Sequence, residues 1–157
     1  MKNIRIISIL VFSVLLFSCG YKPAKQMNMN MINIQDINIT GEKKIIFRLK
    51  NNILLVSNNN SSNKYDIGIK VTKKKIAKIK DTSGKVTRYD LSLSTNLKLI
   101  NLNNKTEITK IFFVNESFDV AKNHSDTIAN EKNITNNIIQ QLSEDIITFI
   151  TAVMRNK

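Results

Sequence analysis

The stretch from Val86 to Asn101 constrains the fold more than any other, because apolar and polar side chains alternate along it. A β-strand points successive side chains to opposite faces, so a period of two predicts a strand with one buried face. The buried face would hold Tyr89, Leu91, Leu93, Thr95, Leu97 and Leu99, and the open face Arg88, Asp90, Ser92, Ser94, Asn96 and Lys98. A sheet of such strands needs an apolar cover on one side only.

Two further segments are expected to pair with this strand. Tyr65 begins an alternation that can continue to Lys80, and Thr106 to about Phe118 makes another strand. The connections are short, and both DTSGK at residues 81–85 and Asn-Asn-Lys at residues 103–105 are typical of turns. Short connections favour antiparallel hairpins, so three meandering strands are expected.

Two segments carry an apolar residue at every fourth position, which is typical of an amphipathic helix. The first runs from Gly41 to Val56, with Glu42 expected in its first turn, where a negative charge suits the helix dipole. The second follows Ser125 and Asp126, which are expected to cap it. The apolar stripes are Ile45, Leu49 and Ile53 in the first segment and Ile134, Ile138, Leu142, Ile146, Ile150 and Met154 in the second.

One more strand is expected before the first helix. Met27 to Thr40 alternates with slips in phase, which indicates a strand with a bulge or bend. The sequence NNNSSN, from Asn58 to Asn63, reads as a loop. The order strand, helix, three strands, helix predicts an α+β fold: a two-layer sandwich in which a mostly antiparallel four-stranded sheet has two helices packed on one face.

The N-terminus has the pattern of a secretory signal. Lys2 and Arg5 precede an uncharged apolar run, Ile6 to Phe17, and small Ser18 stands directly before the only cysteine of the chain, Cys19. The run is shorter than the roughly 20 residues that a membrane-spanning helix needs. The alternative is an N-terminal membrane anchor with an incidental cysteine.

The segment LLFSC resembles the lipobox of bacterial lipoproteins, in which cleavage before the cysteine is followed by its acylation. This resemblance implies a signal peptide at 1–18, a lipidated tether at 19–26 with Cys19 as the lipid-attachment residue, and a single domain at 27–157. Several acyl chains, palmitate among them, would hold the protein stably to a membrane. Consumption of the lone cysteine by lipid would also explain why an exported chain lacks a disulfide partner for it.

The charge balance points to an anionic partner. Lys and Arg number 24 against 12 acidic residues, a formal net charge of +12. Export argues against nucleic acid and favours anionic lipid, lipopolysaccharide or cell-wall polymer. A second explanation is an AT-rich genome, because Asn, Ile and Lys have AT-rich codons.

The densest basic cluster flanks the DTSGK turn. Lys73, Lys74, Lys75, Lys78 and Lys80 approach the turn, and Lys85 and Arg88 leave it. Of these, Lys78, Lys80, Lys85 and Arg88 are candidates for binding lipopolysaccharide phosphates through charge-assisted contacts. The alternative is a solvated lysine face that blocks aggregation of the sheet.

Signs of catalysis are lacking in the sequence. The single histidine, His124, lies in a polar stretch and is expected to cap a helix or to be solvated. No Cys/His or carboxylate cluster has metal-like spacing, and no glycine-rich phosphate loop occurs. The protein is therefore expected not to be an enzyme and to hold no metal or other cofactor.

The mature chain resembles the LPS-assembly lipoprotein family, LptE, in its alphaproteobacterial form. The matching segments are CGYKP, RLKNNILL, GKVTRYDLSLSTNLKLI, FFVNESFDVAKN and ANEKNITNNIIQQLSEDI, and their order and spacing carry the resemblance. It implies a lipoprotein anchored in the outer membrane and facing the periplasm and a barrel lumen. There it would plug and help assemble an LptD-type β-barrel and assist insertion of lipopolysaccharide. The competing interpretation is a structural or pilot lipoprotein that binds anionic cell-wall polymer or another outer-membrane complex.

Overall fold

The computed structural model of the chain describes residues 32–155. The predicted signal peptide, Cys19 and the tether lie outside the described residues, as do residues 27–31 of the predicted first strand. The element order is β1 (Asn33–Thr40), α2 (Lys43–Leu54), β2 (Lys64–Lys80), β3 (Val86–Asn101), β4 (Glu107–Asp119) and α3 (His124–Arg155). This order is the one predicted from the sequence.

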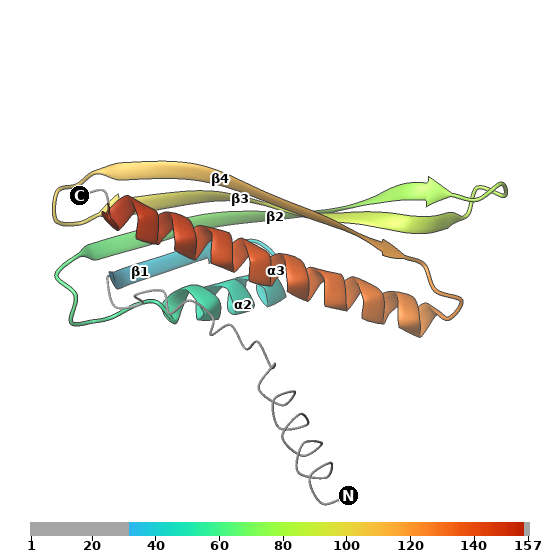
Figure 1. Cartoon of the computed structure of the whole chain (residues 1–157), viewed down its shortest axis with the longest axis horizontal. Coiled ribbons are helices and arrows are strands. Elements are labelled where there is room, and N and C mark those ends of the chain that lie inside the picture. The colour runs from blue at the N-terminus through green and yellow to red at the C-terminus, as the bar shows by residue number, and fades with distance from the viewer. Residues whose placement is uncertain (1–31, 156–157) are drawn as a thin grey trace, which may run out of the picture.

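The four strands form one sheet in the order β1-β2-β3-β4 (Figure 1). As predicted, β2 pairs antiparallel with β3, and β3 with β4. The first strand, whose partner the sequence left open, pairs parallel with β2, and the predicted bulge falls between Ile34 and Asp36. Helix α2 supplies the crossover that parallel neighbours require.

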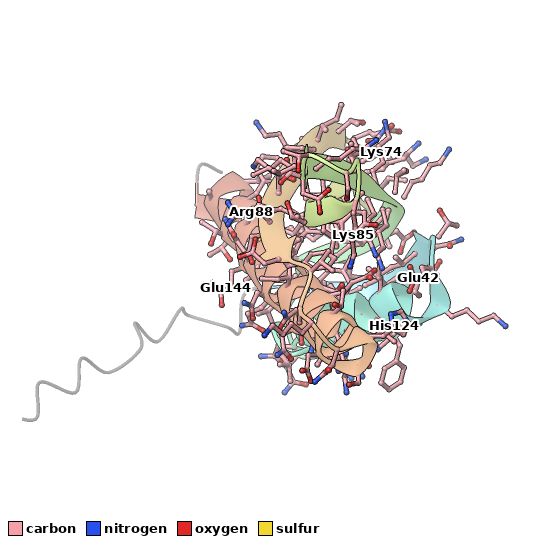
Figure 2. All side chains as sticks on the ribbon, turned by 90° about the vertical axis from the view of Figure 1, so that its right-hand side faces the viewer. Glu42, Lys74, Lys85, Arg88, His124 and Glu144 are labelled. Atoms are coloured by element: carbon pink, nitrogen blue, oxygen red, sulfur yellow. The ribbon has the colours of Figure 1, made fainter. Side chains whose placement is uncertain are left out.

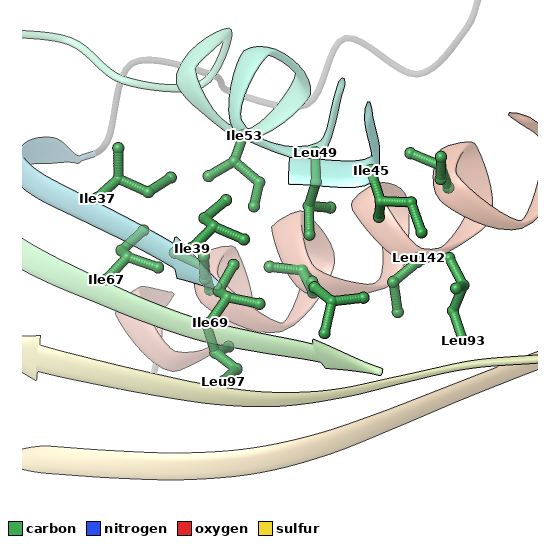
Figure 3. Close-up of a cluster of buried hydrophobic side chains, with 14 of the residues drawn as sticks. Ile37, Ile39, Ile45, Leu49, Ile53, Ile67, Ile69, Leu93, Leu97 and Leu142 are labelled. Carbon is green, nitrogen blue, oxygen red and sulfur yellow. The ribbon is translucent and has the colours of Figure 1, made fainter. Parts of the chain in front are cut away.

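Both helices cover the same face of the sheet, which confirms the predicted two-layer α+β fold (Figure 1). The residues predicted on the buried face of β3 are buried, except that Tyr89 is half-buried. Figure 3 shows how isoleucines of β1, β2 and α2 meet leucines of β3 and α3 in this layer. Apolar burial of this kind, at about 25 cal/mol per Å², is the main stabilising term of such a domain.

The cover does not extend along the whole hairpin of β2 and β3. Burial on β2 ends at Val71, and residues 74–80 are exposed. The hairpin therefore projects beyond the packed layer, and its tip lies away from the start of α3 (Figure 1). Gly84 stands in the turn with φ +84°, a conformation that a residue without Cβ adopts freely.

Two predicted helix starts are wrong by one or two residues. Glu42 is the N-cap of α2 rather than a member of its first turn, and its carboxylate lies 3.7 Å from Lys73 Nζ. Helix α3 begins at His124, so Ser125 and Asp126 lie inside the first turn. The backbone N–H of Thr127 already donates to Asn123 O at 3.3 Å, which starts the helix before the predicted caps.

Candidate functional site at the β2–β3 hairpin

The outer face of the hairpin, away from the helices, holds Lys78 in a polar network. Lys78 Nζ lies 3.0 Å from Asp90 Oδ1 and donates to Ser117 Oγ at 3.0 Å. Ser117 Oγ in turn donates to Asp90 Oδ1. Three strands thus contribute one side chain each, and the charge of Lys78 is compensated inside the sheet.

Arg88 is also engaged on this face. Residues Arg88 and Asp119 are direct partners in the register of β3 and β4. Arg88 Nε donates to one carboxylate oxygen of Asp119, and Nη2 donates to the other at 3.2 Å. This fork-to-fork geometry is the one that guanidinium groups use for carboxylates and phosphates alike.

The pKa values follow from these contacts. The hydrogen bond from Ser117, together with Lys78, holds the pKa of Asp90 below its ordinary value. The hydrogen bond from Arg88 lowers the pKa of Asp119, and the same contact raises the pKa of Arg88. Both carboxylates therefore stay ionised at neutral pH, and their charges oppose the two cations.

The helix-facing side of the hairpin carries a second network, centred on Glu131 of α3. Lys75 Nζ lies 2.6 Å from one Glu131 oxygen, and Lys73 Nζ lies 3.5 Å from the other. The hydrogen bond from Lys75 is the main reason that the pKa of Glu131 is lowered. Lys75 Nζ also lies 4.4 Å from the ring centroid of Tyr89, which stacks on Phe118 at 5.6 Å.

An open cavity of about 390 Å³ adjoins this network. It lies between the hairpin and the link from β4 to α3, and Figure 2 views the molecule from this end, with Lys85 and His124 labelled. The lining residues are Lys75, Lys85, Val86, Tyr89, Val120, Ala121, Lys122, His124 and Thr127. Among these described residues there are three lysines and a histidine but no carboxylate, so the cavity has the charge of an anion site.

The four predicted site residues therefore do not form one cluster in the structure. Lys78 and Arg88 are paired with acids on the outer face, whereas Lys80 and Lys85 form no ion pair within residues 32–155. Of the four, Lys85 alone lines the cavity. The planar fork of Arg88 is already occupied by Asp119, so a ligand phosphate would have to displace that carboxylate.

Of the other charged cavity residues, Lys75 was predicted only as a member of the basic cluster, and Lys122 and His124 were not predicted as binding residues. Lys122 lies in the link between β4 and α3, and His124 is the first residue of α3. Both line the same cavity as Lys85 because β4 runs back alongside β3. The sequence gives no signal for this meeting, because it depends on the register of β3 with β4, which pairs Arg88 with Asp119. His124 is exposed, as predicted.

Neither a metal centre nor a membrane-spanning helix is present within residues 32–155. No group of three or more His, Cys, Asp or Glu side chains in this part of the chain is arranged to hold a metal ion. Neither of its helices combines the length and the apolar character needed to cross a bilayer.

No protein-family model matches the sequence, and no curated relative matches it. Solved structures do share the fold. Lipoprotein B from Nitrosomonas europaea has a TM-score of 0.62 at 13% identity, with 83% of this chain and 90% of that one covered. Rare lipoprotein B from Shewanella oneidensis has a TM-score of 0.59 at 10% identity, with 81% and 98% covered.

A minor lipoprotein from Acinetobacter baumannii superposes with a TM-score of 0.55 at 15% identity, with 76% of this chain and 92% of that one covered. At these identities the likeness concerns the fold. The chain thus has the α+β fold of these bacterial lipoproteins over nearly their whole length.

Proposed function

We propose that the protein is an outer-membrane lipoprotein of the LptE type, anchored through acylated Cys19. Its domain plugs and helps assemble an LptD-type β-barrel, and it binds lipopolysaccharide on the way to the outer leaflet. The role is one of binding and assembly, without catalysis or a cofactor. The observation that carries the proposal is the fold shared with rare lipoprotein B, combined with a lipobox-like segment at Cys19.

The two faces of the sheet support the plug role in different ways. The helix-covered face packs into the hydrophobic core, so its side chains are not accessible to a partner protein. The outer face of β3 is polar, with Ser92, Ser94 and Asn96 along its middle, and suits a water-lined surface. The outer face as a whole is mixed, because Ile76 on β2 and Ile111 and Phe113 on β4 are also exposed on it, so it offers a barrel wall both polar and apolar contacts.

The cavity supports binding of the phosphates of lipopolysaccharide. Lys85 and Lys122 come from the hairpin and the β4–α3 link, and together they can face one phosphate from two directions. Tyr89 and Val86 give the same cavity apolar surface, which suits a ligand that joins phosphate to acyl chains. Lys75 is paired with Glu131, so it could contact a ligand phosphate only after that ion pair breaks.

Binding is tested with purified mature protein and lipopolysaccharide in a direct assay, at low and at high salt. The double variant Lys85→Ala with Lys122→Ala should weaken binding, and the wild-type affinity should fall with salt because screening shortens the range of the charges. The matched control is Lys64→Ala with Lys110→Ala, which removes the same charge from exposed positions outside the cavity. Equal loss in both doubles would mean that bulk charge alone binds the ligand.

The partner is tested by extraction of the acylated protein from its own membranes in mild detergent. A large β-barrel should copurify in a fixed ratio and should fold poorly in cells that lack the lipoprotein. Recovery of the lipoprotein with peptidoglycan or with a different membrane complex, and without a barrel, would instead support a structural or pilot role.

A further inference from the structure

The face of α2 that points away from the core is apolar at its centre. Ile45, Leu49 and Ile53 are buried, whereas Phe47 is 68% exposed and Leu54 is 38% exposed. Phe47 and Leu54 are separated by two helical turns, so they lie on one line along the solvent side. Leu55, just past the helix end, is 75% exposed and adds apolar surface beside Leu54 at this end of the helix.

Cations flank the apolar line on both sides. By the helical period, Lys43 and Lys50 lie along one flank of Phe47 and Leu54, and Lys44 and Arg48 lie along the other. The segment from Lys43 to Leu55 contains no acidic residue, and none of its four cations forms an ion pair with the rest of the described chain. An apolar centre between two rows of cations is the pattern of a helix that lies on an anionic bilayer surface.

The chain enters the fold beside this face. Ile32 forms a parallel bridge with Ser57, and the N–H of Asn58 donates to Ile32 O at 2.6 Å. The point at which the N-terminal segment joins the domain is therefore close to Leu54 and Leu55. The stretch from Cys19 to Ile32 can span at most about 45 Å, so an anchor at Cys19 would keep this end of the domain near the membrane.

We propose that the solvent face of α2, formed by Lys43, Lys44, Phe47, Arg48, Lys50, Leu54 and Leu55, docks on the anionic phospholipid surface of the membrane that carries the protein. This function goes beyond the barrel role and orients the free lipoprotein before it meets its partner. This docking depends on the proposed anchor at Cys19 in one respect only, which is that the anchor keeps α2 at a high local concentration near the bilayer. Docking inserts Phe47 and Leu54 at the level of the headgroups, while the cations contact lipid phosphates.

The chain has no tryptophan, so the fluorescence of a single introduced tryptophan reports the environment of that one position. The test uses acylated mature protein in vesicles of phosphatidylglycerol and phosphatidylcholine whose acyl chains carry bromine as a quencher. The indole of Phe47→Trp should be quenched and shifted to the blue in anionic vesicles, and several-fold less in pure phosphatidylcholine. Phe113→Trp is the matched control, because Phe113 is 65% exposed on the outer face of the sheet, opposite to the helices.

Charge is tested in the Phe47→Trp background. Adding Lys43→Gln with Lys50→Gln should reduce the quenching of the indole at position 47 several-fold, whereas adding Lys64→Gln with Lys110→Gln should leave it unchanged. Equal quenching of the indoles at positions 47 and 113, or none at position 47 in anionic vesicles, would overturn the docking. A blue shift that grows with protein concentration in the absence of vesicles would assign the face to a second copy and would equally overturn it.

The anchor and the docking fail separately in this design. Flotation with the vesicles and the mass of the acyl chains report on Cys19, and quenching of the indole at position 47 reports on α2. Protein that floats while this indole stays unquenched contradicts the docking and leaves the anchor intact. A Cys19→Ser chain of mature length that carries Phe47→Trp should still show anionic quenching at excess vesicles, so loss of the anchor does not prevent the measurement.

Discussion

Arg88 on β3 and Asp119 on β4 stand directly opposite each other in the sheet and share two hydrogen bonds. The only arginine of the hairpin therefore meets an internal carboxylate. Its neighbour Lys85 forms no ion pair within residues 32–155 and lines the cavity instead. Because Arg88 is paired and Lys85 is not, substitutions of these two cations should weaken the binding of an anionic ligand to different extents.

Arg88→Ala should weaken lipopolysaccharide binding less than Lys85→Ala, because Asp119 already occupies the guanidinium. Asp119→Asn should change binding little, because Arg88 and Asp119 lie on the outer face and neither of them lines the cavity. Titration of lipopolysaccharide into each variant measures the order. If Arg88→Ala proves the most damaging single change, the ligand displaces Asp119 and binds on the outer face.

Leu142→Ala should cost about 2–5 kcal/mol of unfolding free energy, the usual range for a buried leucine. Leu142 is fully buried in the layer that also contains Ile45 and Leu93 (Figure 3). Urea denaturation measures the loss, and Gln141→Ala at the exposed neighbouring position is the control. A loss as small as that of the control would mean that Leu142 is not buried in this layer, because even a site that collapses fully still loses the transfer free energy of the side chain.

Thr95→Val should stabilise the protein by about 1 kcal/mol, because an unsatisfied buried hydroxyl costs about 1–3 kcal/mol and valine keeps nearly the same shape without it. Thr95 is buried in the helix-facing layer, and its Oγ1 has no hydrogen-bond partner within the described chain. Denaturant midpoints measure the gain, and Thr109→Val, at an exposed position, should change the midpoint little. Destabilisation by Thr95→Val would show that the hydroxyl is satisfied, for instance by a water molecule.

Gly41→Ala should destabilise the domain by about 1–3 kcal/mol, the cost of a strained backbone position. Gly41 has φ +147°, and a Cβ there would lie 2.8 Å from Val71 O. Gly84→Ala separates the two causes, because Gly84 also has positive φ but has open space around it. Denaturant midpoints should fall further for Gly41→Ala than for Gly84→Ala. Equal shifts would mean that the backbone angle alone sets the cost.

Glu131 should make stability depend on pH on the acid side. Lys75 lowers the pKa of Glu131 in the folded state, so the contribution of this carboxylate is present above its unfolded pKa and is lost as the pH falls through the folded pKa. The stability gap between wild type and Glu131→Gln should be widest above about pH 5 and should close on acidification. Thermal midpoints across roughly pH 3 to 7 would measure it. A gap independent of pH would assign the effect to packing rather than to charge.

Much of the architecture follows from the sequence because period-two and period-four patterns are local. The alternation in Val86–Asn101 sets which side of β3 is buried, and the stripe of Ile138, Leu142 and Ile146 sets the buried side of α3. The short turns at residues 81–85 and 103–105 then leave antiparallel pairing as the simplest arrangement.

Only the tertiary structure decided how the charges are distributed. Arg88 and Asp119 are far apart in the sequence, and their pairing depends on the register of β3 with β4. The cavity likewise needs Lys85 and Lys122 to be brought together by the return of β4 toward the hairpin. Periodicity fixes which face a side chain occupies, but long-range register fixes its neighbours. A charge can be identified from the sequence alone, whereas its neutralisation depends on residues that only the folded chain brings within reach.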